Sequence, residues 1–304
     1  MQALVRQTTG DPLAPAAASG GRATTQRQLT KARIAEEVEA VARILEHDPV
    51  AATVCHSCGG KGAAAWLLRP AKPNHYFSDE QFKVTLRSRL DLAQELGAGA
   101  CQHISANGVT CGAVLDSRGA HAMSCPSGGW TCRRHDRSRD ALAGYAEAHG
   151  GAVTKETILP YIAPGHLQSR MDVVLRTART TGQMLVDVTI VSPLTQEMLR
   201  SGTAARVPGA AASAAAAHKR QTYPNSNVVP FAIEHFGRWG EDAIALVKSL
   251  APPPGEERSE ALTSIYQDVA CEIQKANADA ILAAAVRDRC ARAFHIGARA
   301  SSAR

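Results

Sequence analysis

The stretch SRMDVVLRTARTTGQMLVDVTIVSP, from Ser169 to Pro193, predicts two strands joined by a short turn. Its apolar runs, RMDVVLR and QMLVDVTIV, are rich in β-branched residues, and threonine and glycine separate them. Each run carries one aspartate among apolar neighbours, where a charge is costly. If the strands pair through the turn at residues 179–182, Asp172 and Asp187 lie close together on one face, because side chains alternate along a strand.

The flanking segments predict an α/β core around this hairpin. A helix at 136–149, closed by Gly150 and Gly151, and a strand AVTKETI precede it. An alanine-rich helix at 208–223, a strand NVVPFAIEHF and a helix at 240–250 follow it. Pro230 places the last strand near an edge or a bulge, since proline cannot donate to a ladder. The predicted fold class is therefore α/β, with a small mixed β-sheet and flanking helices.

The remaining chain divides into further segments by composition. Residues 1–27, rich in Ala, Gly, Thr and Pro without periodicity, predict a disordered leader, and an organelle transit peptide is an alternative. The next region is predicted helical, with a helix at 28–45 and another after Ser78, which fits a capping box with Gln81. The predicted units are a leader at 1–27, a helical region at 28–100, a Cys/His segment at 101–135, the α/β core at 136–250 and a C-terminal helical tail at 256–298.

Composition places the chain among globular proteins. It has 304 residues, of which 45% are hydrophobic, and this is enough for a sizeable core. No apolar run reaches the roughly 18 residues of a membrane-spanning helix, and the sequence shows no secretory signal. We therefore expect no membrane association and a nuclear or cytoplasmic location. The net charge of +6 permits a polyanionic partner.

Clustered cysteines and histidines predict a zinc site. Eight cysteines in a chain without a secretory signal favour metal binding over disulfides. Structural zinc takes four nitrogen or sulfur ligands. The spacing C-x9-C-x9-H-x3-C selects Cys101, Cys111, His121 and Cys125. His103, Cys132 and His135 are competing ligands, and the alternative is a set of unpaired, packed cysteines. Cys55 and Cys58 form a lone C-x2-C, which is at most half of a metal site.

The two hairpin acids predict a divalent cation site. Neighbouring carboxylates repel each other, and a cation such as Mg²⁺ removes that conflict. Bound Mg²⁺ can activate water for phosphodiester cleavage. Lys219 on the alanine-rich helix is the candidate that completes the site, with Tyr223 on the same side of that helix. Glu156 on the preceding strand is a candidate third carboxylate. The alternative is that the acids are solvated or paired with Arg170 or Arg176.

Basic residues near the Cys/His segment predict phosphate contacts. Several arginines follow that segment at the start of the predicted helix, and another lies beside Asp172. Arginine is well suited to phosphate because its guanidinium donates in a planar fork. The candidates are Arg133, Arg134, Arg137 and Arg170, with Arg139 close by. The alternative is a solvated helix face, since nearby aspartates dilute the charge.

The order of these features resembles a known nuclease family. Glu156, Arg170-Met171-Asp172, Asp187-Val188-Thr189 and Lys219 to Tyr223 resemble the restriction-like endonuclease of site-specific LINE-type retrotransposons, a branch of the PD-(D/E)XK nucleases. The upstream LDSRGAHAMSC and RRHD resemble the zinc knuckle that precedes this nuclease in reverse-transcriptase polyproteins. The likeness covers about residues 80–250. Met171 stands where the family usually has proline, and Thr189 stands where a lysine is common.

This resemblance implies a restriction-endonuclease-like core and a metal-dependent endodeoxyribonuclease. By this analogy Asp172 and Asp187 hold Mg²⁺ or Mn²⁺, Glu156 assists, and Lys219 orients water or neutralises the transition state. The upstream cluster would hold a structural Zn²⁺. The implied partners are DNA and the RNA of the element. The alternative is a catalytically inactive, zinc-containing nucleic-acid-binding or interaction protein derived from such an element.

Overall fold

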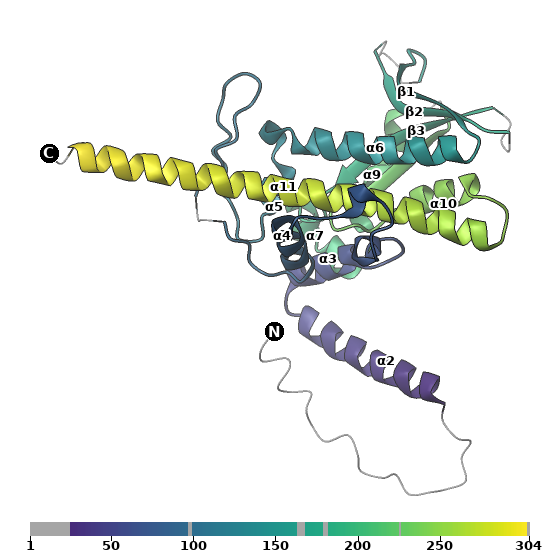
Figure 1. Ribbon diagram of the computed structural model, residues 1–304, viewed down its shortest axis with the longest axis horizontal. Helices are drawn as coiled ribbons and strands as arrows, with labels where there is room; N and C mark the ends of the chain where they lie inside the picture. The colour runs from purple at the N-terminus through teal and green to yellow at the C-terminus, as the bar shows by residue number, and fades with distance from the viewer. Residues whose placement is uncertain (1–24, 97–98, 163–167, 179–181, 225, 303–304) are drawn as a thin grey trace, which may run out of the picture. The chain divides into compact units, whose positions relative to one another are not determined.

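The hairpin predicted at Ser169–Pro193 forms the middle of a four-stranded mixed sheet. In the computed structural model, β1 (Ala152–Ile158), β2 (Arg170–Arg176), β3 (Gln183–Val191) and β4 (Val228–Glu234) lie in that order across the sheet. The first three strands are labelled in Figure 1. β1, β2 and β3 pair antiparallel, whereas β3 and β4 pair in parallel. The predicted α/β class with a small mixed sheet is therefore confirmed.

The structure describes residues 25–302, without 97–98, 163–167, 179–181 and 225. The leader predicted at 1–27 lies almost wholly outside the described residues. The chain forms two units, Met1–Leu45 and Glu46–Arg304. The described part of the first unit contains the helix α2 (Gln26–Leu45), which agrees with the helix predicted at 28–45. Leu29, Ile34 and Val38 on this helix are each more than half exposed.

The register of β2 and β3 sets the two hairpin acids side by side. Val173 pairs with Val186 and Val174 with Leu185, so Asp172 and Asp187 occupy the next cross-strand position. On its other side, Asp187 lies opposite Pro230 of β4. β4 is an edge strand of the described sheet, as Pro230 predicts.

Helices cover the sheet and build the rest of the second unit. α6 (Trp130–Ala148) and α11 (Glu256–Ser302) run side by side (Figure 1). α9 (Ala210–Thr222) and α10 (Glu241–Leu250) pack against β4. The shorter helices are α3 (Pro49–Cys58), α4 (Asp79–Arg89), α5 (Ala120–Ser124), α7 (Gln196–Ser201) and α8 (Thr203–Arg206), with the 3₁₀ turns η1 (Ala65–Leu67), η2 (Pro73–His75) and η3 (Pro126–Gly128).

Two helix starts bear directly on the sequence predictions. The backbone of Gln81 donates to Ser78 Oγ at 3.2 Å, and the backbone of Ser78 donates to Gln81 Oε1 at 3.0 Å, so the predicted capping box is present at α4. α6 begins at Trp130 and not near residue 136, because Gly129, with φ of 71°, ends the preceding turn. Arg133, Arg134 and Arg137, which were expected near the first residue of this helix, therefore lie three to seven residues inside it.

The predicted C-terminal tail is a single helix, α11, and its stretch from Ile265 to Ile281 packs in the interior. Ile265 and Ile273 pack in one core with Phe231 of β4 and Leu142 of α6. Further along, Ile281 packs in a second core with cysteines of the Cys/His segment. The segments predicted after residue 45 thus share their hydrophobic cores. Among the described residues, no helix combines the length and apolarity that crossing a bilayer requires.

Candidate active site and metal centre

Lys219 reaches the hairpin acids across the sheet. Its Nζ lies 2.8 Å from Oδ1 of Asp187, a β3 residue that is only 4% exposed. The approach is possible because α9 presents alanines to β4: Ala212 and Ala216 pack on Ala232. Tyr223 follows at the end of α9 and also hydrogen-bonds Asp187. The sequence prediction that Lys219 and Tyr223 face the same way agrees with this arrangement.

Asp172 is held by two donors on one carboxylate oxygen. Its Oδ2 accepts the backbone N–H of Val188 at 2.7 Å. The same oxygen lies 3.1 Å from Nε2 of His135, which projects from α6. His135 was considered in the sequence as a competing zinc ligand, and the structure places it beside the acid pair. The RRHD motif that includes it lies near the hairpin because α6 packs against β1, β2 and β3.

The two carboxylates experience different electrostatic environments. Burial raises the pKa of Asp172, but the hydrogen bond and charge of His135 and the Val188 N–H outweigh it and hold that pKa below its usual value. For Asp187, burial is the largest effect and, with the Asp172 charge, keeps its pKa above the usual value against the opposing Lys219. Burial and the Asp187 charge also raise the pKa of Tyr223 to about 12.

These side chains surround an open hollow of about 610 Å³. Asp172 and Asp187 lie in its wall, together with Lys219, Tyr223 and Thr189. Arg170 and His135 complete the basic part of the lining. The hollow therefore brings together acids that can bind a cation and bases that can bind an anion.

Glu156 does not join the acid pair. It lies on β1 with φ of 54°, an uncommon backbone conformation for a residue other than glycine, and it interrupts the ladder between Lys155 and Thr157. Its carboxylate contacts Arg139 of α6 and lies 2.6 Å from Nε of Arg170. That places it in an adjacent hollow shared with Arg139. The prediction of a third carboxylate at the cation site is not met, because two arginines hold Glu156 elsewhere.

Of the arginines predicted to contact phosphate, Arg134 is in the interior. It is 1% exposed, and its guanidinium bonds Met123, Asn277 and His235. It is therefore not placed to meet a phosphate, and that prediction is wrong for this residue. The reason is helical geometry, since neighbouring residues on a helix point in different directions.

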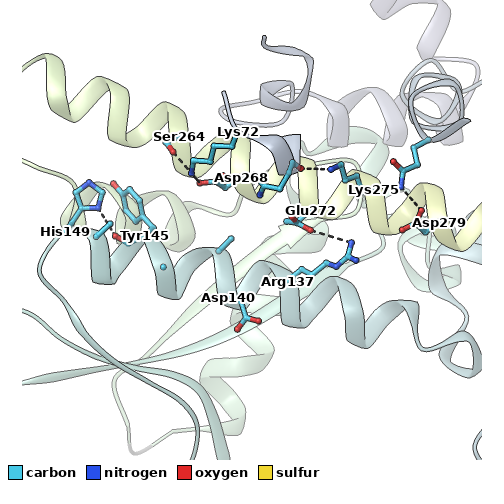
Figure 2. Close-up of a pocket in the computed structure, with 15 residues that line it drawn as sticks. Lys72, Arg137, Asp140, Tyr145, His149, Ser264, Asp268, Glu272, Lys275 and Asp279 are labelled. Carbon is cyan, nitrogen blue, oxygen red and sulfur yellow. Dashed lines mark hydrogen bonds and ion pairs between the residues drawn. The ribbon is translucent and has the colours of Figure 1, made fainter. Parts of the chain in front are cut away.

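The other three predicted arginines are exposed. Arg133 stacks over Trp130, with 4.7 Å from its guanidinium carbon to the ring centre. Arg170 projects toward the acid hollow and Glu156. Arg137 points from α6 to α11, 3.5 Å from Glu272, as Figure 2 shows. The hollow in Figure 2, of about 820 Å³, is lined by such ion pairs between the two helices and their neighbours, including Lys72 with Asp268 at 2.6 Å.

The predicted zinc ligands come together in one cluster. The ligand atoms of Cys101, Cys111, His121 and Cys125 all lie within 4.8 Å of one another. Sγ of Cys101 and Sγ of Cys125 are 3.7 Å apart, and Sγ of Cys111 and Nε2 of His121 are 3.5 Å apart. A zinc tetrahedron with bonds of about 2.0–2.3 Å has edges of roughly 3.3–3.8 Å. The cluster can therefore hold a metal such as zinc.

Local backbone structure explains how distant cysteines meet. The backbone N–H of Cys111 donates to His103 at 2.8 Å, and that of Cys101 donates to Ala113 at 2.7 Å, so the intervening residues fold back as a narrow loop. Asp116 accepts the backbone N–H groups of Ala120 and His121 at 3.0 and 2.7 Å and so fixes the start of α5. The residues between Cys101 and Cys111 thus form a loop whose two ends lie close together, so both cysteines reach the cluster.

The competing ligands lie outside this cluster. Cys132 is exposed on α6, and His135 contacts Asp172. His103 is buried, and neither of its ring nitrogens has a hydrogen-bond partner among the described residues. In the lone C-x2-C of α3, Cys55 is exposed, whereas burial raises the pKa of Cys58 to about 12.

No protein-family model and no curated protein matches this chain.

Proposed function

We propose that this chain is a divalent-metal-dependent DNA endonuclease whose reaction centre is the hollow of Asp172, Asp187 and Lys219. The single observation that carries the proposal is the 2.8 Å contact between Lys219 Nζ and Asp187 Oδ1, with Asp172 on the neighbouring strand. The resemblance to the nuclease family implies an acid pair on adjacent strands with an ammonium group from a following helix. The contacts of Asp172, Asp187 and Lys219 agree with this arrangement and support the proposal.

The donor chemistry of the hollow fits a hard divalent cation. Asp172 and Asp187 would hold Mg²⁺ or Mn²⁺, since these ions bind through one or two carboxylates together with water and phosphate oxygens. A cation bound there supplies activation of water and stabilisation of the leaving oxygen. The mutual repulsion of the two acids, which helps to raise the pKa of Asp187, is a further reason for a cation between them.

Basic residues of the chain would bind and orient the phosphate of the substrate. Lys219 neutralises part of the negative charge on the acids and can donate to a non-bridging phosphate oxygen. Arg170, with its side chain 62% exposed at the edge of the hollow, can bind a phosphate of the backbone. Tyr223 adds a hydroxyl next to Asp187. Lys219, Arg170 and Tyr223 would thus orient the substrate, while Asp172 and Asp187 would hold the cation.

We further propose that Cys101, Cys111, His121 and Cys125 bind Zn²⁺ in a structural role. All four positions of the tetrahedron come from the chain, which is typical of structural and not catalytic zinc.

Cleavage of supercoiled plasmid by the full chain tests the proposed function. We expect nicking with Mg²⁺ or Mn²⁺ and none with a chelator, and we expect Asp172→Asn and Asp187→Asn to abolish it. Asp242→Asn, which removes an acid paired with Arg220 on α9, is the matched control and should cut like the wild type. Equal nicking by the wild type and by Asp187→Asn would refute the assignment. DNA binding without metal-dependent nicking would favour the inactive nucleic-acid-binding alternative.

A further inference from the structure

Helix α6 connects the Cys/His cluster to the acid hollow. It begins at Trp130, shortly after Cys125, and its first turns then pass beside the sheet. Arg134 and His135 are consecutive on this helix but point to different surroundings. Arg134 enters the core, and His135 reaches Asp172. The position of His135 therefore depends on what holds this part of α6.

Arg134 holds α6 to α5, to α11 and to the residue that follows β4. One guanidinium nitrogen donates to the carbonyl of Met123 at 3.1 Å and to Oδ1 of Asn277 on α11 at 2.6 Å. Another lies 2.8 Å from Nε2 of His235, which directly follows β4. Met123 lies between the cluster ligands His121 and Cys125. Because a guanidinium donates in a fixed planar fork, these contacts set the helix position along and around its axis.

His135 then fixes one oxygen of Asp172. With a proton on Nε2, its ring donates to Oδ2 across 3.1 Å, and the Val188 N–H donates to the same oxygen across 2.7 Å. Its Nδ1 lies 3.3 Å from Oδ1 of Asp136, and with a second proton on Nδ1 the ring donates to a carboxylate on each side. Two donors on Oδ2 restrict the rotation of the carboxylate.

We propose that His135 is a positioning residue for Asp172 and that it sets the affinity of the acid pair for its divalent cation. The inference rests on the proposed function. Hydrogen-bond partners of metal-binding carboxylates orient them, and removing such a partner typically weakens metal affinity or activity by about 10–100-fold. His135 acts through Asp172 and does not itself touch the substrate or the cation.

Titration of the zinc-loaded full chain with Mn²⁺, followed by the loss of the free-ion paramagnetic resonance signal, tests this. We expect His135→Ala to bind Mn²⁺ about 10–100-fold more weakly than the wild type. His135→Gln, whose amide nitrogen can take the place of Nε2, should recover affinity to within a few-fold. His149→Ala, at the other end of α6, is the matched control and should bind like the wild type.

The cleavage assay adds a second readout that a general loss of structure would not reproduce. In His135→Ala the Mn²⁺ concentration for half-maximal nicking should rise, while the rate at saturating Mn²⁺ stays within a few-fold of the wild type. If His135→Ala binds Mn²⁺ as tightly as the wild type while Asp187→Asn does not bind it, the positioning role is wrong and the proposed function stands. If the wild type itself does not bind Mn²⁺, the proposed function fails and this inference fails with it.

Discussion

Nη2 of Arg134 lies 2.8 Å from Nε2 of His235, and both side chains are buried. A guanidinium can only donate, so Nε2 of His235 must accept, and its imidazole must be neutral in the folded protein. Burial, reinforced by the Arg134 charge, holds the pKa of His235 well below its usual value. Burial also lowers the pKa of Arg134 to about 10. A contact deep in the core therefore makes stability depend on pH.

We predict that the free energy of unfolding falls as the pH drops below about 6.5, the ordinary histidine pKa. Below that pH the unfolded chain takes up a proton at His235 and the folded protein does not, so acid favours the unfolded state. The contribution of one such group approaches about 1.4 kcal/mol per pH unit. Urea unfolding at several pH values between 7.5 and 5.5 measures this slope.

His235→Gln keeps an acceptor for Arg134 but cannot take a proton, so it should flatten the slope. His218→Gln, at an exposed position on α9, should leave the slope unchanged. Parallel slopes for the wild type and His235→Gln would show that His235 does not titrate on unfolding.

Replacing Lys219 by methionine should lower DNA nicking by about 100-fold or more, because it removes the preorganised charge beside the acids. Methionine keeps a long, flexible side chain against α9. Lys155→Met is the control, since Lys155 is a half-exposed lysine that pairs with Asp140 at 2.9 Å. Rates from plasmid nicking at saturating Mg²⁺ give the comparison. A rate within about threefold of the wild type would remove Lys219 from the proposed centre.

The purified protein should contain one equivalent of zinc, and Cys125→Ser should lose it. Elemental analysis by plasma mass spectrometry gives the metal content. Chelation should also expose amides between Cys101 and Cys125 to hydrogen exchange, because that segment depends on its four ligands. Cys132→Ser, which changes an exposed cysteine outside the cluster, should retain full zinc content. Zinc retained in Cys125→Ser would exclude the predicted ligand set.

Ser78→Ala should lower the free energy of unfolding by about 1 kcal/mol, since it removes a helix cap whose partner is the N–H of Gln81. Ser259→Ala, at an exposed position near the start of α11, is the matched control. Denaturant titration of the two variants at neutral pH makes the comparison. Equal stabilities would mean that α4 does not depend on its capping box.

Much of the fold could be predicted because the sheet obeys simple periodicity. Alternation along β2 and β3 places Asp172 and Asp187 on one face, and the alanines of α9 allow Lys219 to approach. The spacing of the Cys/His residues selects the cluster once the loop between Cys101 and Cys111 is allowed to fold back. These features depend on local pattern and on side-chain chemistry, which a sequence displays directly.

The unpredicted features depend on where elements meet. Helix α6 starts at Trp130, before the predicted residue 136. Within it Arg134 points into the core and His135 contacts Asp172, and no local sequence pattern predicts how this helix packs on the sheet. Glu156 does not join the acid pair, because Arg139 and Arg170 hold its carboxylate elsewhere and its positive φ departs from the alternation of a regular strand. α11 is rich in alanine, so its sequence conceals that the stretch from Ile265 to Ile281 lies in the hydrophobic cores.

The central position of α11 has a consequence for how the protein is made. Its Ile265, Ile273 and Ile281 complete both cores, yet they leave the ribosome after every strand and after α6. Until then, apolar residues such as Phe231 lack their partners on α11, and contacts of high sequence separation form slowly. The nascent chain therefore passes through a stage in which the sheet and α6 are synthesised but the isoleucines of α11 are still missing from their cores. Incomplete intermediates of this kind expose apolar surface until α11 is added, which makes them prone to aggregation.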